Sequence, residues 1–466
     1  MGKQEYHCRV WLPDRSDSPV SGDLLINVNG AIELRVFGTE QGVPRETQIL
    51  NGEINNSPIT LIGDYLMASR GVFEPSVIIF GNRFSNTGEI SYNVIDIEFG
   101  YFHSFFLNMV EEGLWAKIPE DSPEKLLPHY STPILLKRNG EDKTRITINS
   151  DTPDKVNSGE PNQRYEATSH LKVQVHSEKE FGLQEIIDTV TKISQFFVLG
   201  FGDRLPIRNV RAYLETPRSH EGPNPIQSNS NPLVRLTFNS EKFQYLPTGR
   251  DPVRAGFPFP RYFSYKDTGN NLTEIFEGYW VKSEEFRPLF ISNLADLVNK
   301  HLYLENVFVS VATALESYYY RKNPGVKKTD KERFDVVLKA MINKMTEEER
   351  KLFEGSVRQC NNLSYREKMR NLCNENARII SSFINDIPGF VSSLKTFRDS
   401  LSHGDSISGD DERTRFVLTT YRAILLCRLI CFKEIGFTED GLLSLLSYSR
   451  GFTSLVSTVT HPGFLN

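Results

Sequence analysis

An arginine and a histidine lie close together near the end of a predicted helix, in the stretch LKTFRDSLSHGD at residues 394–405. A histidine can give and take protons near neutral pH, and an arginine offers a permanent charge and a planar fork that suits a phosphate. Arg398 and His403 are therefore the minimum needed to cleave RNA through its own 2′-hydroxyl without a metal. We take both as candidate catalytic residues.

The geometry of a helix limits how this pair can act. The five residues from Arg398 to His403 turn through about 500°, so the two side chains point about 140° apart. They can meet on one small ligand if the last helical turn loosens, or if a second copy of the helix supplies the other half. Gly404 suits the position that closes a helix, and His403 lies at the negative end of the helix dipole.

The same residues have less specific interpretations. An Arg–His pair at this spacing also occurs by chance, and a solvated helix end with a loosely paired cation is the plain alternative. Arg164 and His170 have a similar spacing, with five residues between them instead of four, but they lead into a strand-like alternation, so we regard them as a decoy. The run at residues 318–322, YYYRK, could stack on RNA, but one core tyrosine with amphipathic neighbours is the favoured interpretation.

No metal or cofactor site is predicted. Cys427 and Cys431 form a CxxxC pair without a matching Cys/His pair, and the five cysteines of the chain suit reduced thiols in a cytoplasm. No HExxH or phosphate-binding glycine motif occurs. The amino-terminal residues contain no apolar stretch that could act as a secretory signal, and the run AILLCRLICF at residues 423–432 is too short for a membrane span. A cytoplasmic protein is expected.

The elements that must position the candidate pair belong to a helical carboxy-terminal part. At 466 residues, two or three domains are expected. We predict an α+β multidomain chain, with a β-rich region at residues 1–285 and an all-α domain at residues 286–466. The β-rich region is either one domain or two subdomains with a break near residues 110–130. Helical stripes run through residues 307–318, 390–401 and 417–432, and Ser364 to Glu367 form a capping-box pattern.

Strand and turn signals dominate the first part of the chain. Alternating apolar residues flank Asn29-Gly30, which predicts a hairpin, and Asn139-Gly140 predicts another. Ile95, Ile97 and Phe99 repeat the strand period. One helix at residues 186–197 interrupts this region and is expected to stop at Gly200. The segment at residues 217–232 is predicted to be a loop.

Charge is divided unevenly between the two parts. Residues 301–466 contain 23 Lys+Arg and 20 Asp+Glu, so the chain totals of 54 and 59 leave 31 and 39 for residues 1–300. The weakly basic helical part suits a polyanionic partner, whereas the acidic remainder argues against nonspecific coating of nucleic acid.

These features together resemble the HEPN superfamily. Its RNases carry R-x4-6-H near a helix end in a small helical bundle, with a polar residue after the arginine. Here that residue is Asp399, where an asparagine is frequent. Glu316, in ATALESYYY, looks like the acidic residue that faces the motif from an upstream helix. The β-rich first part followed by SYREKMRNL and FRDSLSHGD resembles the ApeA group of anti-phage HEPN ribonucleases.

The resemblance implies roles and partners. His403 would be the general acid or base and Arg398 would hold the scissile phosphate, leaving a 2′,3′-cyclic phosphate and a 5′-hydroxyl. Asp399 and Glu316 would support them. HEPN domains usually pair, so a homodimer or a higher even homo-oligomer is expected. The substrate would be tRNA or another structured cellular RNA, cut to abort infection, and the β-rich region would respond to a phage-derived trigger.

Two other functions remain open. A non-catalytic HEPN module could dimerise and bind nucleic acid or protein, and it would tolerate loss of His403. A small-molecule enzyme in the β-rich region would need a set of catalytic residues that this region does not offer.

Overall fold

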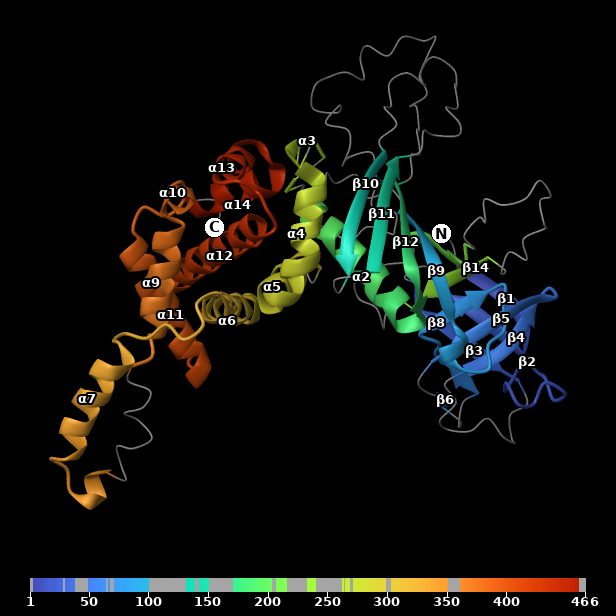
Figure 1. Cartoon of the computed structure of the whole chain (residues 1–466), viewed down its shortest axis with the longest axis horizontal. Coiled ribbons are helices and arrows are strands. Elements are labelled where there is room, and N and C mark those ends of the chain that lie inside the picture. The colour runs from blue at the N-terminus through green and yellow to red at the C-terminus, as the bar shows by residue number, and fades with distance from the viewer. Residues whose placement is uncertain are drawn as a thin grey trace, which may run out of the picture. The chain divides into compact units, whose positions relative to one another are not determined.

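The computed structural model describes residues 3–27, 30–37, 49–63, 66–67, 71–99, 131–138, 142–150, 171–202, 207–215, 233–239, 262–263, 265–268, 271–298, 303–350 and 361–460. The chain divides into two compact units, Met1–Glu277 and Gly278–Asn466, and the division falls within helix α4 (Leu272–Glu285). The first unit is built on a β-sheet and the second is helical, which confirms the predicted α+β class (Figure 1).

Fourteen strands of the described residues form one sheet in the first unit, in the order β10-β11-β12-β9-β13-β14-β8-β5-β4-β1-β2-β3-β7-β6. All neighbouring strands in this order pair antiparallel. The strand bounds are β1 Gln4–Trp11, β2 Val20–Ile26, β3 Ile32–Val36, β4 Ile49–Ile54, β5 Ser57–Ile62, β6 Leu66–Met67, β7 Val72–Phe73, β8 Val77–Phe80, β9 Ser91–Phe99, β10 Ser131–Arg138, β11 Asp142–Ser150, β12 Leu171–Gly182, β13 Ile207–Tyr213 and β14 Val234–Phe238. A short 3-10 helix, η1 (Thr87–Glu89), precedes β9.

Both predicted hairpins are confirmed. Strands β2 and β3 pair with Ile26 opposite Ile32, and Gly30 in the turn has φ +82°. Strands β10 and β11 pair with Arg138 opposite Asp142, and the predicted Asn139-Gly140 turn itself lies outside the described residues. Ile95, Ile97 and Phe99 are buried on β9, as their alternation predicts.

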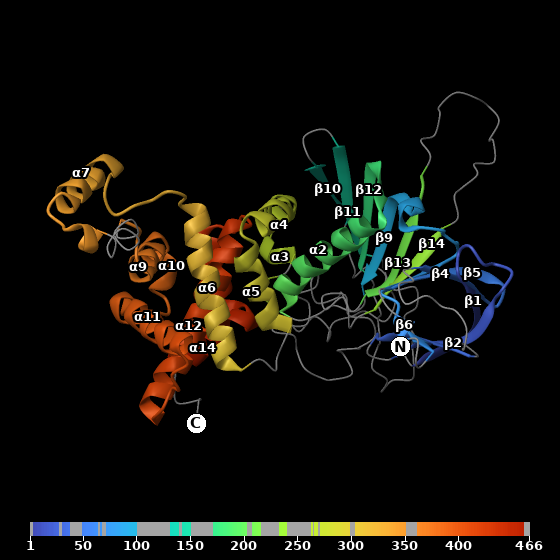
Figure 2. The ribbon, with the colours of Figure 1, turned by 90° about the horizontal axis from the view of Figure 1, so that it is seen from below.

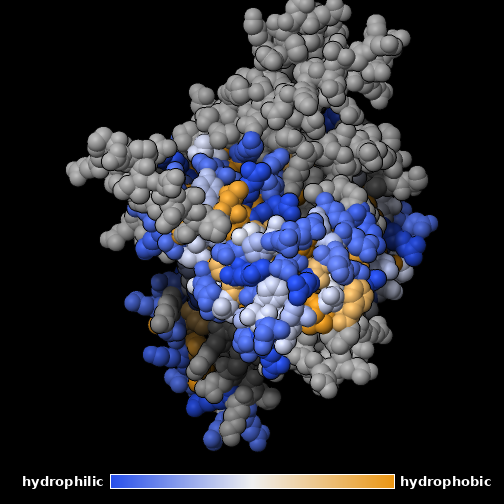
Figure 3. Space-filling model, turned by 90° about the vertical axis from the view of Figure 1, so that its right-hand side faces the viewer, coloured by the Kyte–Doolittle hydropathy of each residue, from blue (hydrophilic) through white to orange (hydrophobic). Residues whose placement is uncertain are grey.

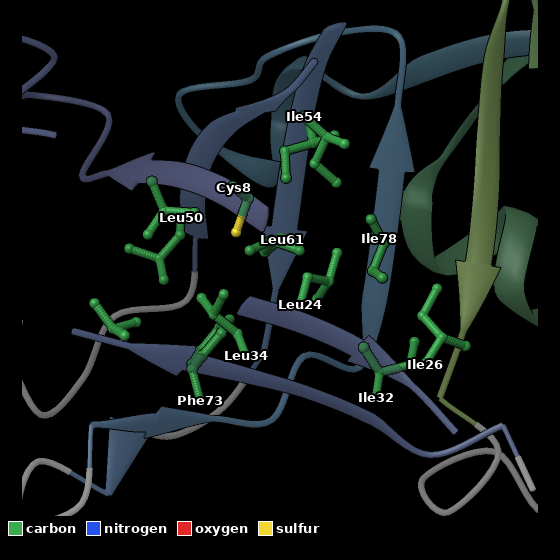
Figure 4. Close-up of a cluster of buried hydrophobic side chains, with 13 residues drawn as sticks. Cys8, Leu24, Ile26, Ile32, Leu34, Leu50, Ile54, Leu61, Phe73 and Ile78 are labelled. Atoms are coloured by element: carbon green, nitrogen blue, oxygen red, sulfur yellow. The ribbon is translucent and has the colours of Figure 1, made fainter. Parts of the chain in front are cut away.

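The sheet at the amino-terminal end encloses an apolar cluster. Side chains from seven strands converge there, including Cys8, Leu24, Leu34, Leu61 and Phe73, each at most 2% exposed (Figure 4). These strands gather on the blue side of the ribbon (Figure 2). Each strand contributes alternate residues to the cluster because successive side chains of a strand point to opposite faces. The described residues on the face in Figure 3 are largely hydrophilic, with small apolar areas between them.

Helix α2 (Leu183–Phe201) packs against β12 and β9 in the same unit. Its buried face includes Ile186, Val190, Ile193 and Phe197, and the Phe197 ring meets that of Phe99 at 5.4 Å between centroids. The predicted end at Gly200 is wrong. Gly200 stays helical, and the helix closes two residues later because Gly202 takes the left-handed conformation, with φ +73° and ψ +11°.

Some sequence predictions fall outside the described residues. These are the decoy pair Arg164 and His170, the proposed break near residues 110–130, and the loop at residues 217–232.

The helical unit follows α3 (Tyr265–Thr268) and the start of α4. Its further helices are α5 Arg287–Val298, α6 Leu304–Lys322, α7 Lys331–Ile342, α9 Tyr365–Glu375, α10 Ala377–Ile380, α11 Ile387–His403, α12 Asp410–Glu434, α13 Glu439–Tyr448 and α14 Arg450–Thr460. None of the helices among the described residues is long and apolar enough to cross a membrane.

Helix α12 is the centre of this unit, since it packs against α5, α6, α11, α13 and α14 (Figure 1). From Ala423 to Phe432 every residue is buried, including Arg428. The predicted one-sided stripe is therefore only partly correct. Leu425, Leu429 and Phe432 are buried, but Val417 and Tyr421 are half-buried. The run AILLCRLICF is apolar because it is surrounded by other helices.

The stripes on α6 and α11 follow the prediction more closely. Val307, Val311, Ala314 and Tyr318 are all buried on α6. Phe390, Leu394 and Phe397 are buried on α11, whereas Leu401, near the helix end, is half-buried instead of in the core. Rings from three helices meet behind α11: Phe397 lies 6.3 Å from Phe308 and 5.2 Å from Phe416 between centroids.

Candidate active site

Helix α11 carries both predicted catalytic residues, and both of its ends are capped. At the start, the Asp386 side chain accepts a hydrogen bond from the backbone N–H of Gly389 at 2.9 Å. At the end, Gly404 has φ +80°. The N–H of Asp405 donates to the Ser400 carbonyl at 3.0 Å, and the N–H of Gly404 donates to the Leu401 carbonyl at 3.2 Å. This pair of bonds is the Schellman motif, which makes His403 the last helical residue.

Arg398 is held by an acidic residue from another helix. Its Nη2 donates to Glu316 Oε2 at 2.8 Å, and the two side chains are 35% and 24% exposed. Glu316 lies on α6, so this contact joins residues 82 positions apart in the sequence. Helices α6, α9 and α11 pack against one another at this point (Figures 1 and 2). The structure thus places Glu316 facing the arginine, which is the arrangement that the sequence resemblance implies.

A second cation shares the same carboxylate. Lys368 Nζ, from α9, donates to Glu316 Oε1 at 2.8 Å, and its side chain is 19% exposed. Each oxygen of Glu316 therefore accepts from a different positive group. Charge-assisted hydrogen bonds of this length are among the stronger ones in proteins.

An aromatic ring supports the guanidinium group. The Arg398 Cζ lies 4.6 Å from the centroid of the Tyr365 ring, within the range of a cation–π contact. Tyr365 is the first residue of α9 and directly follows Ser364, which forms the predicted capping box with Glu367. Burial raises the pKa of the Tyr365 hydroxyl, although the charge of Arg398 opposes this. Within the described part of the chain, that hydroxyl has no hydrogen-bond partner.

Asp399 pairs with a neighbour on its own helix. Lys395 Nζ donates to Asp399 Oδ2 at 2.6 Å, while Arg398 Nη1 lies 3.8 Å from Asp399 Oδ1. The carboxylate at this position is thus neutralised mainly by Lys395. It does not compete with Glu316 for the main hydrogen bond of Arg398.

His403 stays apart from this cluster within one chain. It is exposed, and among the described residues no hydrogen bond or ion pair joins it to Arg398, Asp399 or Glu316. The structure therefore brings Arg398, Asp399 and Glu316 together and leaves His403 at the helix end. The angular separation calculated from the sequence agrees with this arrangement.

Lys368 and Tyr365 were missed by the sequence reasoning. The capping box located the start of α9, and the spacing of three places both residues on one face of that helix. However, no local pattern predicts that this face packs against Glu316, which is 52 residues away from Lys368 in the sequence.

No group of three or more potential metal-ligating side chains occurs among the described residues. Cys427 and Cys431 are buried thiols. Burial raises the pKa of Cys431 well above its usual value. Asn293 Nδ2 contacts Cys427 Sγ at 3.4 Å, so the CxxxC pair is part of the helical core.

Two family models match this chain, one for each of its two parts. The model for the Apea-like HEPN domain matches residues 309–441, which contain Glu316, Lys368, Arg398 and His403. The helical unit is thus a HEPN domain, a class whose members are generally RNases. The model for ApeA N-terminal domain 1 matches residues 5–279. The chain belongs to the ApeA family of anti-phage HEPN proteins. No curated protein and no solved structure matches it.

Proposed function

We propose that this chain is a metal-independent endoribonuclease that cleaves tRNA or another structured cellular RNA to abort phage infection. The observation that carries the proposal is the position of Arg398. It lies half-exposed on the Tyr365 ring and is held in place by Glu316, five residues before an exposed histidine at a capped helix end. An arginine oriented in this way can bind a phosphate, because its guanidinium has five N–H donors and, among the described residues, hydrogen-bonds only to Glu316.

In the proposed reaction, the RNA supplies its own nucleophile. The 2′-hydroxyl attacks the adjacent phosphorus while a base removes its proton, and the 5′-oxygen leaves after an acid protonates it. The products are a 2′,3′-cyclic phosphate and a 5′-hydroxyl. His403 performs a proton transfer, and Arg398 stabilises the negative charge that builds on the phosphate oxygens.

A second copy of the chain completes the site in this proposal. Among the described residues of one chain, no hydrogen bond or ion pair joins His403 to Arg398, and the helical spacing points the two side chains about 140° apart. A symmetric pairing of two α11 helices would place the histidine of one copy beside the arginine of the other. The functional unit is accordingly a homodimer or a higher even assembly.

The test compares purified wild-type protein with its His403→Ala variant on total cellular RNA in EDTA, with the ends of the products mapped. Loss of a general acid or base should lower the cleavage rate by about a hundredfold or more. His7→Ala is the matched control, since His7 is an exposed histidine of the sheet unit whose side chain is 71% exposed.

Discrete EDTA-resistant cuts with cyclic phosphate ends, present in wild type and His7→Ala but absent in His403→Ala, would support the proposal. Equal cutting by all three proteins, or cutting that disappears in EDTA, would contradict it. If His403→Ala also protects cells from phage as well as wild type does, the chain acts as a non-catalytic HEPN binding module.

A further inference from the structure

Two cations share the two oxygens of one carboxylate in the candidate site. Arg398 Nη2 donates to Glu316 Oε2 and Lys368 Nζ donates to Glu316 Oε1, both at 2.8 Å. The three side chains come from α11, α6 and α9, so the packing of three helices fixes the positions of the two donors. Donors that bind the two oxygens of one carboxylate are close enough together to bind two oxygens of another small anion. A phosphodiester presents its two non-bridging oxygens at a spacing similar to that of a carboxylate.

The charges around this point favour an additional anion. The cluster contains three cations, Arg398, Lys368 and Lys395, and two carboxylates, Glu316 and Asp399. The group therefore has one positive charge more than its carboxylates neutralise. Tyr365 underlies the cluster and stays uncharged, because burial raises the pKa of its hydroxyl.

Lys368 is also well placed to reach a ligand. Its side chain is 19% exposed, so the ammonium group is partly shielded from water but not enclosed. Partial burial strengthens its interaction with an anion, because screening by solvent is weaker there than at the open surface. An ammonium group has three donors, and Glu316 uses one of them among the described contacts.

We propose that Lys368 is a second phosphate-binding residue of this site, acting beside Arg398 on the RNA backbone. Glu316 holds both cations in the binding geometry when RNA is absent. This inference depends on the proposed function, because it assumes that the anion bound by Arg398 is an RNA phosphate.

The test measures how RNA affinity depends on salt, using the full-length His403→Ala protein so that the probe is not cut. The probe is labelled bulk transfer RNA, and the dissociation constant is measured by fluorescence anisotropy over a series of salt concentrations. Each lost phosphate contact lowers the slope of log affinity against log salt by about 0.7–0.9. Lys368→Ala should lower the slope by this amount, and Lys368→Arg should keep the parent slope.

A matched control separates the loss of a contact from the loss of an ion pair. Lys433 pairs with Glu439 at 2.8 Å in the same unit, with 31% exposure. Lys433→Ala removes an equal charge and a comparable ion pair, so its slope should equal that of the parent. A slope that falls equally in Lys433→Ala would show only a general charge effect and would overturn the proposal.

The Arg398→Ala background separates direct contact from positioning. If Lys368 binds phosphate itself, adding Lys368→Ala to Arg398→Ala lowers the slope again by a similar amount. If Lys368 acts only by positioning Arg398, the second substitution leaves the slope unchanged, and the proposal is wrong.

The cleavage assay distinguishes failure of this inference from failure of the proposed function. If wild type cuts RNA and His403→Ala does not, the nuclease function stands even when Lys368→Ala leaves the salt slope of RNA binding unchanged. If the parent binds no RNA and wild type does not cut, both proposals fail.

Discussion

Replacing Glu316 by glutamine should destabilise the helical unit, and the contacts of Glu316 set the size of the effect. The carboxylate accepts a hydrogen bond from Arg398 and one from Lys368, each at 2.8 Å. A glutamine of nearly the same shape has one acceptor oxygen, and its amide N–H₂ would face the second cation. One charge-assisted hydrogen bond is therefore lost, and two neighbouring cations lose their shared counter-charge.

The expected loss is intermediate between that of a buried and that of an exposed ion pair. Hydrogen bonds to charged groups contribute about 1.5–3 kcal/mol, whereas fully exposed pairs contribute about 0–1 kcal/mol. The three side chains are 19–35% exposed, so solvent screening reduces the first figure. We expect Glu316→Gln to lower the free energy of unfolding by about 1–2 kcal/mol, which lowers the thermal midpoint by roughly 2–8 °C for a unit of this size.

The assay is thermal unfolding of the full-length protein followed by far-ultraviolet circular dichroism, which reports mainly on the helices. A double-mutant cycle of Glu316→Gln with Lys368→Met should give a coupling free energy above about 0.5 kcal/mol, because the residues are in contact. A cycle with the distant Lys433→Met should be additive. An unchanged midpoint, or additivity in both cycles, would refute the view that Glu316 holds the two cations.

Two further substitutions test the packing of the helical unit. Gly278→Ala should destabilise it by about 1–3 kcal/mol, because the new Cβ would lie 2.5 Å from the Ile435 backbone oxygen, and an unchanged thermal midpoint would contradict this contact. Burial alone would raise the pKa of Glu434, but hydrogen bonds from Lys322 and Tyr318 outweigh it and lower the pKa below 4.5. A lowered pKa stabilises the fold above the unfolded value, so Glu434→Gln should be less stable than wild type at pH 7. Denaturant titrations should show this difference shrinking as pH falls through the lowered pKa, and a constant difference from pH 7 to pH 3 would contradict the pairing.

Local sequence signals predicted the elements that have one buried face. The stripes of α6 and α11 follow the helical period because one side of each helix packs on the unit and the other meets water. The Asn29-Gly30 turn could be predicted because few residue pairs adopt the backbone conformation that a tight hairpin turn needs. Helix α12 was predicted as a helix from its apolar stripe but not as the central one, since that stripe does not reveal that residues 423–432 are buried on every side.

The candidate site was predictable only in part, because some of its residues come together only through packing between helices. Arg398 and His403 belong to one short motif, so their spacing could be read directly. Glu316 was recognised only through the family resemblance. Lys368 escaped prediction because its role depends on how α9 packs against α6, and no local pattern in the sequence encodes that packing.

The length of α11 has a consequence for any residue at its far end. Seventeen residues with a rise of 1.5 Å each make a rod about 25 Å long, with the Asp386 cap at one end and His403 at the other. A tilt of about 5° about the capped start would move His403 by about 2 Å along an arc. Displacements of about 1 Å can reduce catalytic rates about a hundredfold. If His403 is the proposed acid or base, the ring packing of Phe397 against Phe308 and Phe416 helps to fix its position, and a core substitution that leaves the fold intact would still lower the cleavage rate.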